Sequence, residues 1–321
     1  MQQEVVVVGS YNQDHAWRVD RFPQAGETRR GSGFSTGPGG KGFNQAVACA
    51  RQQVGTAFLG AHGHDASGLD AERQARAEGL ADRWLLLEDV PTGTAAILVD
   101  DQGQNQIIVD LAANERLDPD FLHLNVDVFT GAKVLLTQME NNASAIHAAL
   151  KLGHEHGLTC LLNPAPVHPD LDPAVLELVD VLLPNESEFA QLCQRCLEEP
   201  IEAERVVQLD NATLHALARR LCRGTVVITL GRHGALVSHG QARRGDREAT
   251  YRMQAETVHS IDTSGAGDAF CGSLAAGLVL FADSPFTAAV RHAGRVAALS
   301  TERRGTTHAM PHHVEVTARF G

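Results

Sequence analysis

The segment Val5-Val6-Val7-Val8-Gly9 is a continuous run of β-branched residues that ends in glycine. Such a run is typical of a strand buried on both faces of a sheet. The same alternation of strand and helix recurs along the chain. We expect helices at 43–51, 143–154, 214–222 and 268–280, and strands at 56–59, 133–136, 158–162, 179–183 and 226–230. This order predicts an α/β fold in three layers, with a mostly parallel sheet and helices on both faces.

Two segments, about 11–37 and 92–112, interrupt this rhythm. Ala95 to Val99 and Gln106 to Val109 are β-branched runs on either side of Asp100-Asp101-Gln102-Gly103. This pattern predicts a hairpin with glycine in its turn. The 11–37 segment has no helical periodicity and is expected to join the hairpin in a small separate β-sheet within a single domain, 1–321. The small sheet is either an active-site lid or an ordinary edge hairpin.

Composition restricts the class of protein. The chain has 321 residues, a net charge of −12 and no basic block, which argues against a protein that binds nucleic acid. No apolar run reaches membrane-spanning length, so no membrane association is expected. The first residues lack the basic region and cleavage site of a signal peptide, and five of the six cysteines lie in apolar segments. These features predict a cytoplasmic protein with free thiols.

Cysteine and histidine clusters offer possible metal sites. Cys193 and Cys196 have the spacing of half a zinc site or a redox pair, but on a helix the same spacing places both on one buried face. His308, His312 and His313 are close in sequence and are either metal ligands or part of a solvated tail. The charged stretch 192–211 is expected to form an extended helix and loop away from the chemistry.

The first dense glycine cluster is Gly37-Pro38-Gly39-Gly40-Lys41-Gly42-Phe43-Asn44. It does not match a Walker A loop, nor is it a GxGxxG in a first strand–helix turn, so a nicotinamide oxidoreductase is disfavoured. Glycines allow backbone amides to approach a ligand closely, and Lys41 and Asn44 add donors. A flexible turn and a ligand cradle both remain open for this cluster.

The second cluster is Asp262-Thr263-Ser264-Gly265-Ala266-Gly267-Asp268, which opens a predicted helix. Free amides and the positive end of the dipole form an anion site at such a helix start. A carboxylate is then costly beside a phosphate. Asp268 is therefore either a plain helix cap or a general base that accepts a hydroxyl proton during phosphoryl transfer.

Two further segments follow predicted strands. In Pro184-Asn185-Glu186-Ser187-Glu188, the spacing of Asn185 and Glu188 indicates a capping box, although the carboxylate could also reach Mg²⁺ through water. Thr229-Leu230-Gly231-Arg232-His233-Gly234 is either a simple β-turn or a loop that wraps a nucleotide.

Together these segments resemble the ribokinase-type (PfkB) family of carbohydrate kinases. The first family signature is similar to Gly39 to Ala46 with Gly60, and the second to Asp262 to Asp268. Asn163-Pro164-Ala165-Pro166 and the two segments of the previous paragraph occur in the family's order. The resemblance extends from Val5 to about Pro311. It implies a Rossmann-like α/β fold with a small β lid, in agreement with the alternation described above.

The resemblance also implies roles in sugar phosphorylation. The segment Gly9 to His15 is similar to the sugar-binding segment of the family's ribose-phosphorylating members. The sugar would be bound by Asn12, Asp14, Gly40, Lys41, Asn44 and Glu140. Asp268 would be the catalytic base on the primary hydroxyl, and Gly265, Ala266 and Gly267 would form the anion hole.

The cofactor sites follow from the same resemblance. ATP would be bound by Asn185, Thr229, Gly231, Gly234, Gly267 and Gly294, with Mg²⁺ near Asn185 and Glu188. A monovalent cation such as K⁺ would lie near Asp262, Ser264, Ser300, Arg303 and Gly305. Ala309 stands where a serine ligand is usual, Gly294 where an adenine-side Asn or His is common, and Phe43 where a small residue is usual beside the sugar loop.

These implications favour ATP-dependent phosphorylation of a pentose, with D-ribose converted to D-ribose 5-phosphate as the leading hypothesis. A nucleoside kinase or another sugar kinase of the family is the alternative, since Phe43 could stack on a base. A catalytically inactive sugar-binding protein is less favoured because Asp268 is retained. The apolar residues of the small sheet predict a homodimer formed through the lid.

Overall fold

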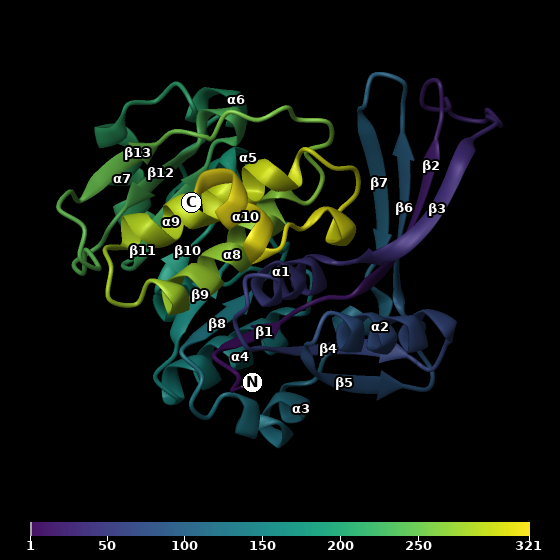
Figure 1. Ribbon diagram of the computed structural model, residues 1–321, viewed down its shortest axis with the longest axis horizontal. Coiled ribbons are helices and arrows are strands. Elements are labelled where there is room, and N and C mark those ends of the chain that lie inside the picture. Colours follow the sequence, from purple (N-terminus) through teal and green to yellow (C-terminus); the bar gives the residue numbers. More distant parts are fainter. Residues whose placement is uncertain (1) are drawn as a thin grey trace.

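A nine-stranded sheet forms the centre of the computed structural model, which describes residues 2–321 (Figure 1). The strand order is β13-β12-β11-β10-β9-β8-β1-β4-β5. The strands from β11 to β5 are parallel, whereas β12 pairs antiparallel with both β11 and β13. The bounds are β1 Val5–Val8, β4 Thr56–Gly63, β5 Ala81–Leu87, β8 Val134–Thr137, β9 Thr159–Leu162, β10 Val181–Leu182, β11 Thr225–Thr229, β12 Ala235–Ser238 and β13 Thr250–Met253.

Helices cover both faces of this sheet, so the predicted three-layer fold is confirmed (Figure 1). One face packs against α1 (Lys41–Ala50), α2 (Ala66–Ala77), α8 (Ala266–Leu280), α9 (Phe286–Ser300) and α10 (His313–Phe320). The other packs against α3 (Pro119–Leu124), α4 (Ala143–Glu155), α5 (Glu186–Leu197), α6 (Ala203–Val206) and α7 (Asn211–Leu221). Short 3-10 turns occupy Ala112–Arg116, Val126–Val128, Pro173–Leu178, Gly231–His233 and Thr307–Ala309.

Strand β1 shows why the apolar run decides the fold. Val5 and Val7 belong to one hydrophobic cluster, and Val6 and Val8 belong to the other. Alternate side chains of a strand point to opposite faces, so a strand between two helical layers must be apolar at every position.

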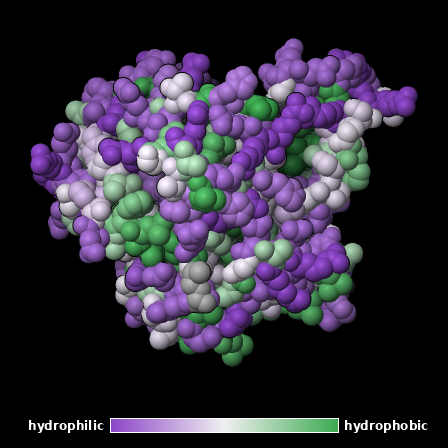
Figure 2. All heavy atoms as spheres, in the orientation of Figure 1, coloured by the Kyte–Doolittle hydropathy of each residue, from purple (hydrophilic) through white to green (hydrophobic). Residues whose placement is uncertain are grey.

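A smaller second sheet projects from this body, with the strand order β3-β2-β6-β7 (Figure 1). Its bounds are β2 Asn12–Arg18, β3 Ser32–Gly39, β6 Gly93–Val99 and β7 Asn105–Asp110. The predicted hairpin is confirmed as the antiparallel pair β6–β7, and the 11–37 segment supplies β2 and most of β3. Figure 2 shows hydrophobic residues beside the hydrophilic ones on this projecting sheet.

The order of strands locates the binding edge. From β1 the chain continues to β4 and β5 on one side, and later to β8, β9, β10 and β11 on the other. The carboxyl end of β1 is therefore a topological switch point, where open α/β sheets bind their ligands. In residues 2–321 no helix has both the length and the apolar character needed to span a bilayer.

Segment 192–211 contains a helix end, a loop and a second short helix, so the expected extended helix and loop are only partly present. Helix α5 continues to Leu197, the short α6 follows, and α7 begins at Asn211. Val206 of α6 is fully buried in the hydrophobic cluster on the α4 and α5 face. This segment therefore extends the core at that face.

Candidate active site

Glu140 joins three segments at the carboxyl end of β1. Its Oε2 accepts hydrogen bonds from the Ser10 hydroxyl at 2.6 Å and from the Lys41 amide at 2.9 Å. The Ser10 hydroxyl in turn accepts one from the Gly42 amide at 3.2 Å. Glu140 follows β8 and Ser10 follows β1, and these strands are neighbours in the sheet. The glycine cluster is thus attached by its backbone to two strand ends.

Asn12 and Asp14 lie at the start of β2, beside this junction. Asn12 Oδ1 accepts a hydrogen bond from Asn114 Nδ2 at 2.9 Å. The Asn114 side chain also exchanges hydrogen bonds with both backbone groups of Tyr11. Asn114 was missed by the sequence analysis because no motif surrounds it and its partners lie about a hundred positions away along the chain.

Asp14 is a partly buried acid among other acids. Burial, followed by the charges of Glu140 and Asp268, raises the pKa of its carboxyl to about 7. The sequence-predicted acidic residues of the sugar site therefore lie near one another in the structure. Burial and the neighbouring charges favour a protonated Asp14 carboxyl near neutral pH.

Asp268 lies in the first turn of α8 and is buried against α1. Its Oδ2 accepts a hydrogen bond from Asn44 Nδ2 at 3.0 Å, and its Oδ1 accepts one from Gln45 Nε2 at 2.9 Å. The N-cap of α8 is Gly265, and α8 has no side-chain cap. The helix-cap interpretation of Asp268 is therefore wrong, since its carboxylate is bonded to α1 instead of capping its own helix.

The start of α8 leaves room for an anion. Gly265 adopts the left-handed conformation, with φ of 73°, which glycine tolerates best. A β carbon at Gly267 would meet no atom within 4 Å, and this residue is exposed. The first amides of a helix have no hydrogen-bond partner within the helix. The amides of Ala266 and Gly267 belong to the first turn of α8, where the sequence predicts an anion hole. The Ala266 amide donates to the Thr263 carbonyl at 3.2 Å.

Lys41 lies among the carboxylates of this site. Burial alone would lower the pKa of its ammonium group, but Asp268, Glu140 and Glu188 raise it above the usual range. Gly40, just before it, has φ of 87°, and a β carbon there would lie 2.8 Å from the backbone of Tyr11 and Asn12. The residue must therefore be glycine for the loop to pack against β2.

Glu188 approaches the site from the start of α5. It forms the predicted capping box: Asn185 Oδ1 accepts from the Glu188 amide at 2.9 Å, and Glu188 Oε2 accepts from the Asn185 amide at 2.9 Å. Burial is the main reason that the pKa of its carboxyl is raised to about 7, and Asp268 adds to the shift. The carboxylate thus has a structural partner and also lies within the field of Asp268.

The predicted nucleotide segments meet beside Asn185. Asn185 pairs with Thr229, the last residue of β11. The following turn is closed by a 2.8 Å hydrogen bond from the Leu230 amide to the Gly234 carbonyl, which confirms a tight turn. Gly234 has φ of 84°, and a β carbon there would lie 1.9 Å from the Met253 carbonyl. Gly231 and Gly294 have no atom within 4 Å of such a carbon, and Gly294 lies on α9.

The residues implied for a monovalent cation are only partly brought together. Asp262 accepts hydrogen bonds from the Ser264 amide at 2.9 Å and the Gly305 amide at 3.0 Å. Ser300 donates its hydroxyl to the Ala297 carbonyl within α9, and Arg303 forms an ion pair with Glu315. Ala309 is buried and offers no side-chain oxygen. Asp262, Ser264 and Gly305 therefore form the compact part of this set.

Phe43 does not line the site. Its side chain is fully buried, and its ring makes edge contacts with Tyr11 at 5.2 Å and Phe58 at 5.6 Å between centroids. The expectation that Phe43 could stack on a base is wrong, because the ring packs into the core while the neighbouring Asn44 turns toward Asp268.

The cysteine and histidine clusters are explained by packing. Burial raises the pKa of both Cys193 and Cys196 on α5. His312 caps α10, His313 packs against His292, and the His308 ring lies near Gly37, so the three histidines have separate surroundings.

One group of three potential metal ligands lies elsewhere. In residues 2–321 the ligand atoms of His154, Cys160 and Asp180 lie within 4.8 Å of one another. The Asp180 carboxylate already accepts from the Cys160 amide at 2.8 Å, and the His154 ring bonds to the Leu178 carbonyl at 2.8 Å. Burial raises the pKa of the Cys160 thiol to about 12, which opposes a thiolate ligand. This group is accounted for by packing.

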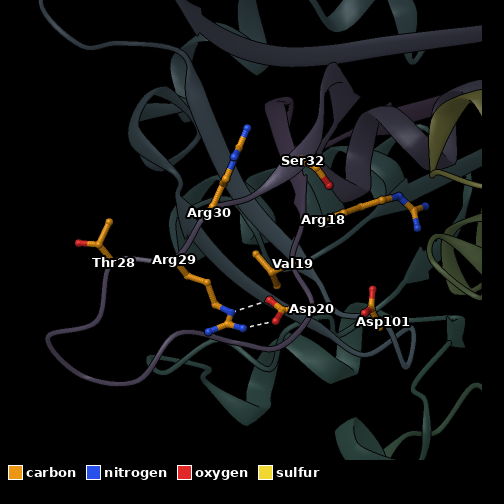
Figure 3. A pocket seen from close by; sticks show the side chains of 8 residues that line it. All are labelled: Arg18, Val19, Asp20, Thr28, Arg29, Arg30, Ser32 and Asp101. Carbon is orange, nitrogen blue, oxygen red and sulfur yellow. Dashed lines mark hydrogen bonds and ion pairs between the residues drawn. The ribbon is translucent and has the colours of Figure 1, made fainter.

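A cavity of about 580 Å³ lies where β2 ends at Arg18 and β3 begins at Ser32 (Figure 3). This is the end of the two strands opposite to Asn12 and Gly39. Arg29 and Asp20 form an ion pair at the lining of the cavity. Its lining of arginines, acids and small polar residues is Arg18, Val19, Asp20, Thr28, Arg29, Arg30, Ser32 and Asp101. None of the predicted sugar or nucleotide residues lines this cavity.

This fold and this grouping of residues agree with known proteins. Residues 2–313 match the model of the pfkB family carbohydrate kinases. The chain is 33% identical over 309 residues to ribokinase of Mus musculus, covering 96% of this chain and 92% of that one. The chain belongs to the pfkB family of carbohydrate kinases.

Solved structures give the same result. The structure of ribokinase from Giardia lamblia is similar with a TM-score of 0.89 and 27% identity, covering 99% of this chain and 98% of that one. That of Arabidopsis thaliana ribokinase complexed with ribose and ATP has a TM-score of 0.80 and 27% identity, covering 99% and 98%. Within the family, the ribokinases are thus similar to this chain over nearly its whole length.

Proposed function

We propose that this protein is an ATP-dependent kinase that transfers the γ-phosphoryl group of ATP to the primary hydroxyl of D-ribose and yields D-ribose 5-phosphate. The observation that carries the proposal is the Asp268 carboxylate, held by Asn44 beside Asp14 and Glu140 at the switch point of the sheet. A polyol needs several donors and acceptors around it, and these residues supply both. The resemblance to ribokinases supports ribose as the sugar.

The chemistry assigned to the site follows from these positions. Asp268 accepts the proton of the primary hydroxyl while that oxygen attacks the γ-phosphorus, and the bond to ADP breaks. The amides of Gly265 and Gly267 at the start of α8 are assigned to the transferring phosphoryl group, because the Ala266 amide already donates to the Thr263 carbonyl. Lys41 offsets negative charge between the sugar and the phosphates. Asn185, Thr229, Gly231, Gly234 and Gly294 are assigned to ATP.

Asn185 and Glu188 fit a magnesium ion held through water. Both carboxylate oxygens of Glu188 already bond to Asn185, so direct coordination would break the capping box. Mg²⁺ keeps several waters when bound, and an outer position suits it. The ion neutralises phosphate charge when bound. For a monovalent cation, Asp262, Ser264 and Gly305 fit best, and Ala309 would contribute only its backbone.

We also infer that the second sheet is a lid that closes over the sugar and that it forms the interface of a homodimer. Asn12 and Asp14, which are assigned to the sugar, lie at the start of its strand β2. The sheet also exposes the apolar residues Phe34, Ile107, Ile108 and Val109, of which Ile108 is 77% exposed. A four-stranded sheet that exposes such residues is stabilised by a partner. Closure over the sugar would exclude water and limit ATP hydrolysis. All six cysteines are free, which supports a reducing compartment such as the cytoplasm.

A coupled assay of ADP release tests the function. The full chain with Mg-ATP is supplied with ribose, fructose, adenosine or pseudouridine, each with and without K⁺. We expect the highest kcat/KM on ribose. A higher value on adenosine or pseudouridine would overturn the sugar assignment. No turnover on any of them, with ribose still raising the Tm, would identify a sugar-binding protein without kinase activity.

A further inference from the structure

A chain of buried carboxamides connects two strand ends to the Asp268 carboxylate. Gln45 on α1 is completely buried, and its Nε2 donates hydrogen bonds to Asp268 Oδ1 and Asn163 Oδ1, each at 2.9 Å. Its Oε1 accepts a hydrogen bond from Gln138 Nε2 at 2.7 Å. Both hydrogens of the Gln45 amide group are therefore used, and a flip of the group would face Gln138 Nε2 with another donor.

The partners of Gln45 are themselves fixed. Asn163 follows β9, and its Nδ2 donates to the Leu183 carbonyl at 2.8 Å, directly after β10. Gln138 follows β8 and is fully buried. A β carbon at Gly272 would lie 2.1 Å from the Gln45 backbone carbonyl, which shows how closely α1 approaches α8. The position of the Gln45 side chain is thus set by the ends of three adjacent strands and by helix packing.

Gln45 differs from Asn44, the other residue that bonds to Asp268. Asn44 belongs to the proposed sugar site, whereas Gln45 has no exposed surface through which to reach a ligand. We propose that Gln45 is a positioning residue, which orients the Asp268 carboxylate and favours its ionised form through one N–H donor. The inference rests on the proposed role of Asp268 as the base.

The surroundings of Asp268 explain why such a donor matters. Besides burial, the charge of Asp268 raises the pKa of Asp14 on β2 and of Glu188 on α5, and that of Cys271 one turn along α8. Glu140, after β8, also acts on Asp14. Lys41 on α1 is the cation that faces this group. The N–H groups of Asn44 and Gln45 donate to the charged form of this carboxylate and favour it. A base at this position therefore depends on its amide partners.

The experiment measures the dependence of kcat on pH for the full chain with saturating Mg-ATP and sugar. Gln45→Met keeps the length of the side chain and removes its donors. We expect kcat to fall about tenfold and the midpoint of the acid limb to rise by about one pH unit. The KM for the sugar should stay within about twofold of the wild-type value, because Gln45 does not reach the ligand.

Gln138→Met is the second variant. It leaves Gln45 in place but removes the donor that fixes the orientation of the Gln45 amide group. The midpoint of the acid limb should therefore rise by less than in Gln45→Met. Gln52→Met is the matched control, because Gln52 is also fully buried and donates its Nε2 to the Pro311 carbonyl at 2.9 Å. It should lower the Tm while the shape of the pH profile stays unchanged.

The possible results distinguish failure of the positioning role of Gln45 from failure of the proposed kinase function. An acid limb that coincides with wild type in both Gln45→Met and Gln138→Met would overturn the positioning role, whatever the change in Tm. The profile is measured with the sugar that the wild-type enzyme turns over best, so an unexpected sugar does not affect it. A wild-type protein inactive on every sugar would overturn the proposed function, and with it the base that Gln45 positions.

Discussion

Gly39 lies directly against Asp14: a β carbon at position 39 would stand 2.2 Å from a carboxylate oxygen of Asp14. The two residues are on paired strands, β3 and β2, two positions apart in register. A side chain of any size at position 39 would therefore displace the acid that is assigned to the sugar.

The first prediction tests this contact. Gly39→Ala should raise the KM for ribose at least about tenfold, because the Asp14 carboxylate must leave its position. Gly37→Ala is the matched control on the same strand, since its β carbon would meet only the His308 ring at an ordinary 3.5 Å. Steady-state kinetics of the two variants check it. Equal KM values in the two variants would remove Asp14 from the sugar site.

The second prediction concerns the base. Asp268→Asn should lower kcat by about 10²- to 10⁴-fold, the usual contribution of a general base, while ribose binding is largely kept. Turnover is measured by ADP release and binding by calorimetry. Asp283→Asn, an exposed acid beyond the end of α8, is the control. Full activity in Asp268→Asn would contradict its assignment.

The third prediction uses the raised pKa of Asp14. Its carboxyl has a pKa of about 7 in the folded chain and near 3.8 when unfolded, so the folded state holds the proton more tightly. The free energy of unfolding should therefore fall as pH rises from about 4 to 7. Asp14→Asn should remove part of this loss, on the order of 1–2 kcal/mol, because water screens a partly buried group.

Urea unfolding at pH 4.5 and pH 8 measures this effect. Asp14→Asn should be more stable than the wild-type protein at pH 8 and nearly equal to it at pH 4.5. The free energy of unfolding of the variant should still fall somewhat between pH 4.5 and pH 8, because the Glu188 carboxyl also has a pKa of about 7. A variant that loses as much stability as wild type between the two pH values would exclude Asp14 as a source.

The fourth prediction concerns magnesium. Glu188→Gln keeps an acceptor for the Asn185 amide but removes the charge, so the Mg²⁺ concentration for half-maximal activity should rise about tenfold. Glu186→Gln, in the same turn of α5, is the control. Activity titrated with Mg²⁺ at fixed ATP gives both values. If both variants shift the titration equally, the effect is general electrostatics and Glu188 has no special role.

The fifth prediction concerns assembly. Ile108→Asp places a charge on the exposed apolar side of the second sheet and should convert a dimer into a monomer at micromolar concentration. Leu124→Asp on α3 is a control with an equally exposed side chain, since Leu124 is 84% exposed. Light scattering gives the mass of each variant. A wild-type monomer would rule out the dimer itself.

The fold followed from the sequence because its signals are local. The valines of β1, the glycine turn of the hairpin and the small residues of α8 each define an element without knowledge of distant partners. The glycine clusters likewise indicated Asn44 and Asp268 as candidate site residues, although each cluster by itself left a purely structural alternative open. These signals depend on spacing within about ten residues.

The parts that the sequence did not reveal depend on distant contacts. Gln45 was visible only as one letter of a motif, because its partners Asn163 and Asp268 lie 118 and 223 positions away. Phe43 was placed beside the sugar loop because it replaces a small residue of the motif, but successive helical residues such as Phe43 and Asn44 point in directions about 100° apart. The packing of α1 against the sheet determines that Asn44, and not Phe43, points toward the site.

The contact between Asn44 and Thr307 has a consequence for biosynthesis. The Thr307 hydroxyl lies 2.9 Å from the Pro38 carbonyl and 2.5 Å from Asn44 Oδ1, so residues separated by more than 260 positions meet at the base of the sugar site. During translation the amino-terminal half can form β1, α1 and β4, yet Asn44 lacks its partners until Asp268 and then Thr307 leave the ribosome. Competence for chemistry is thus acquired only after residue 307 has been made.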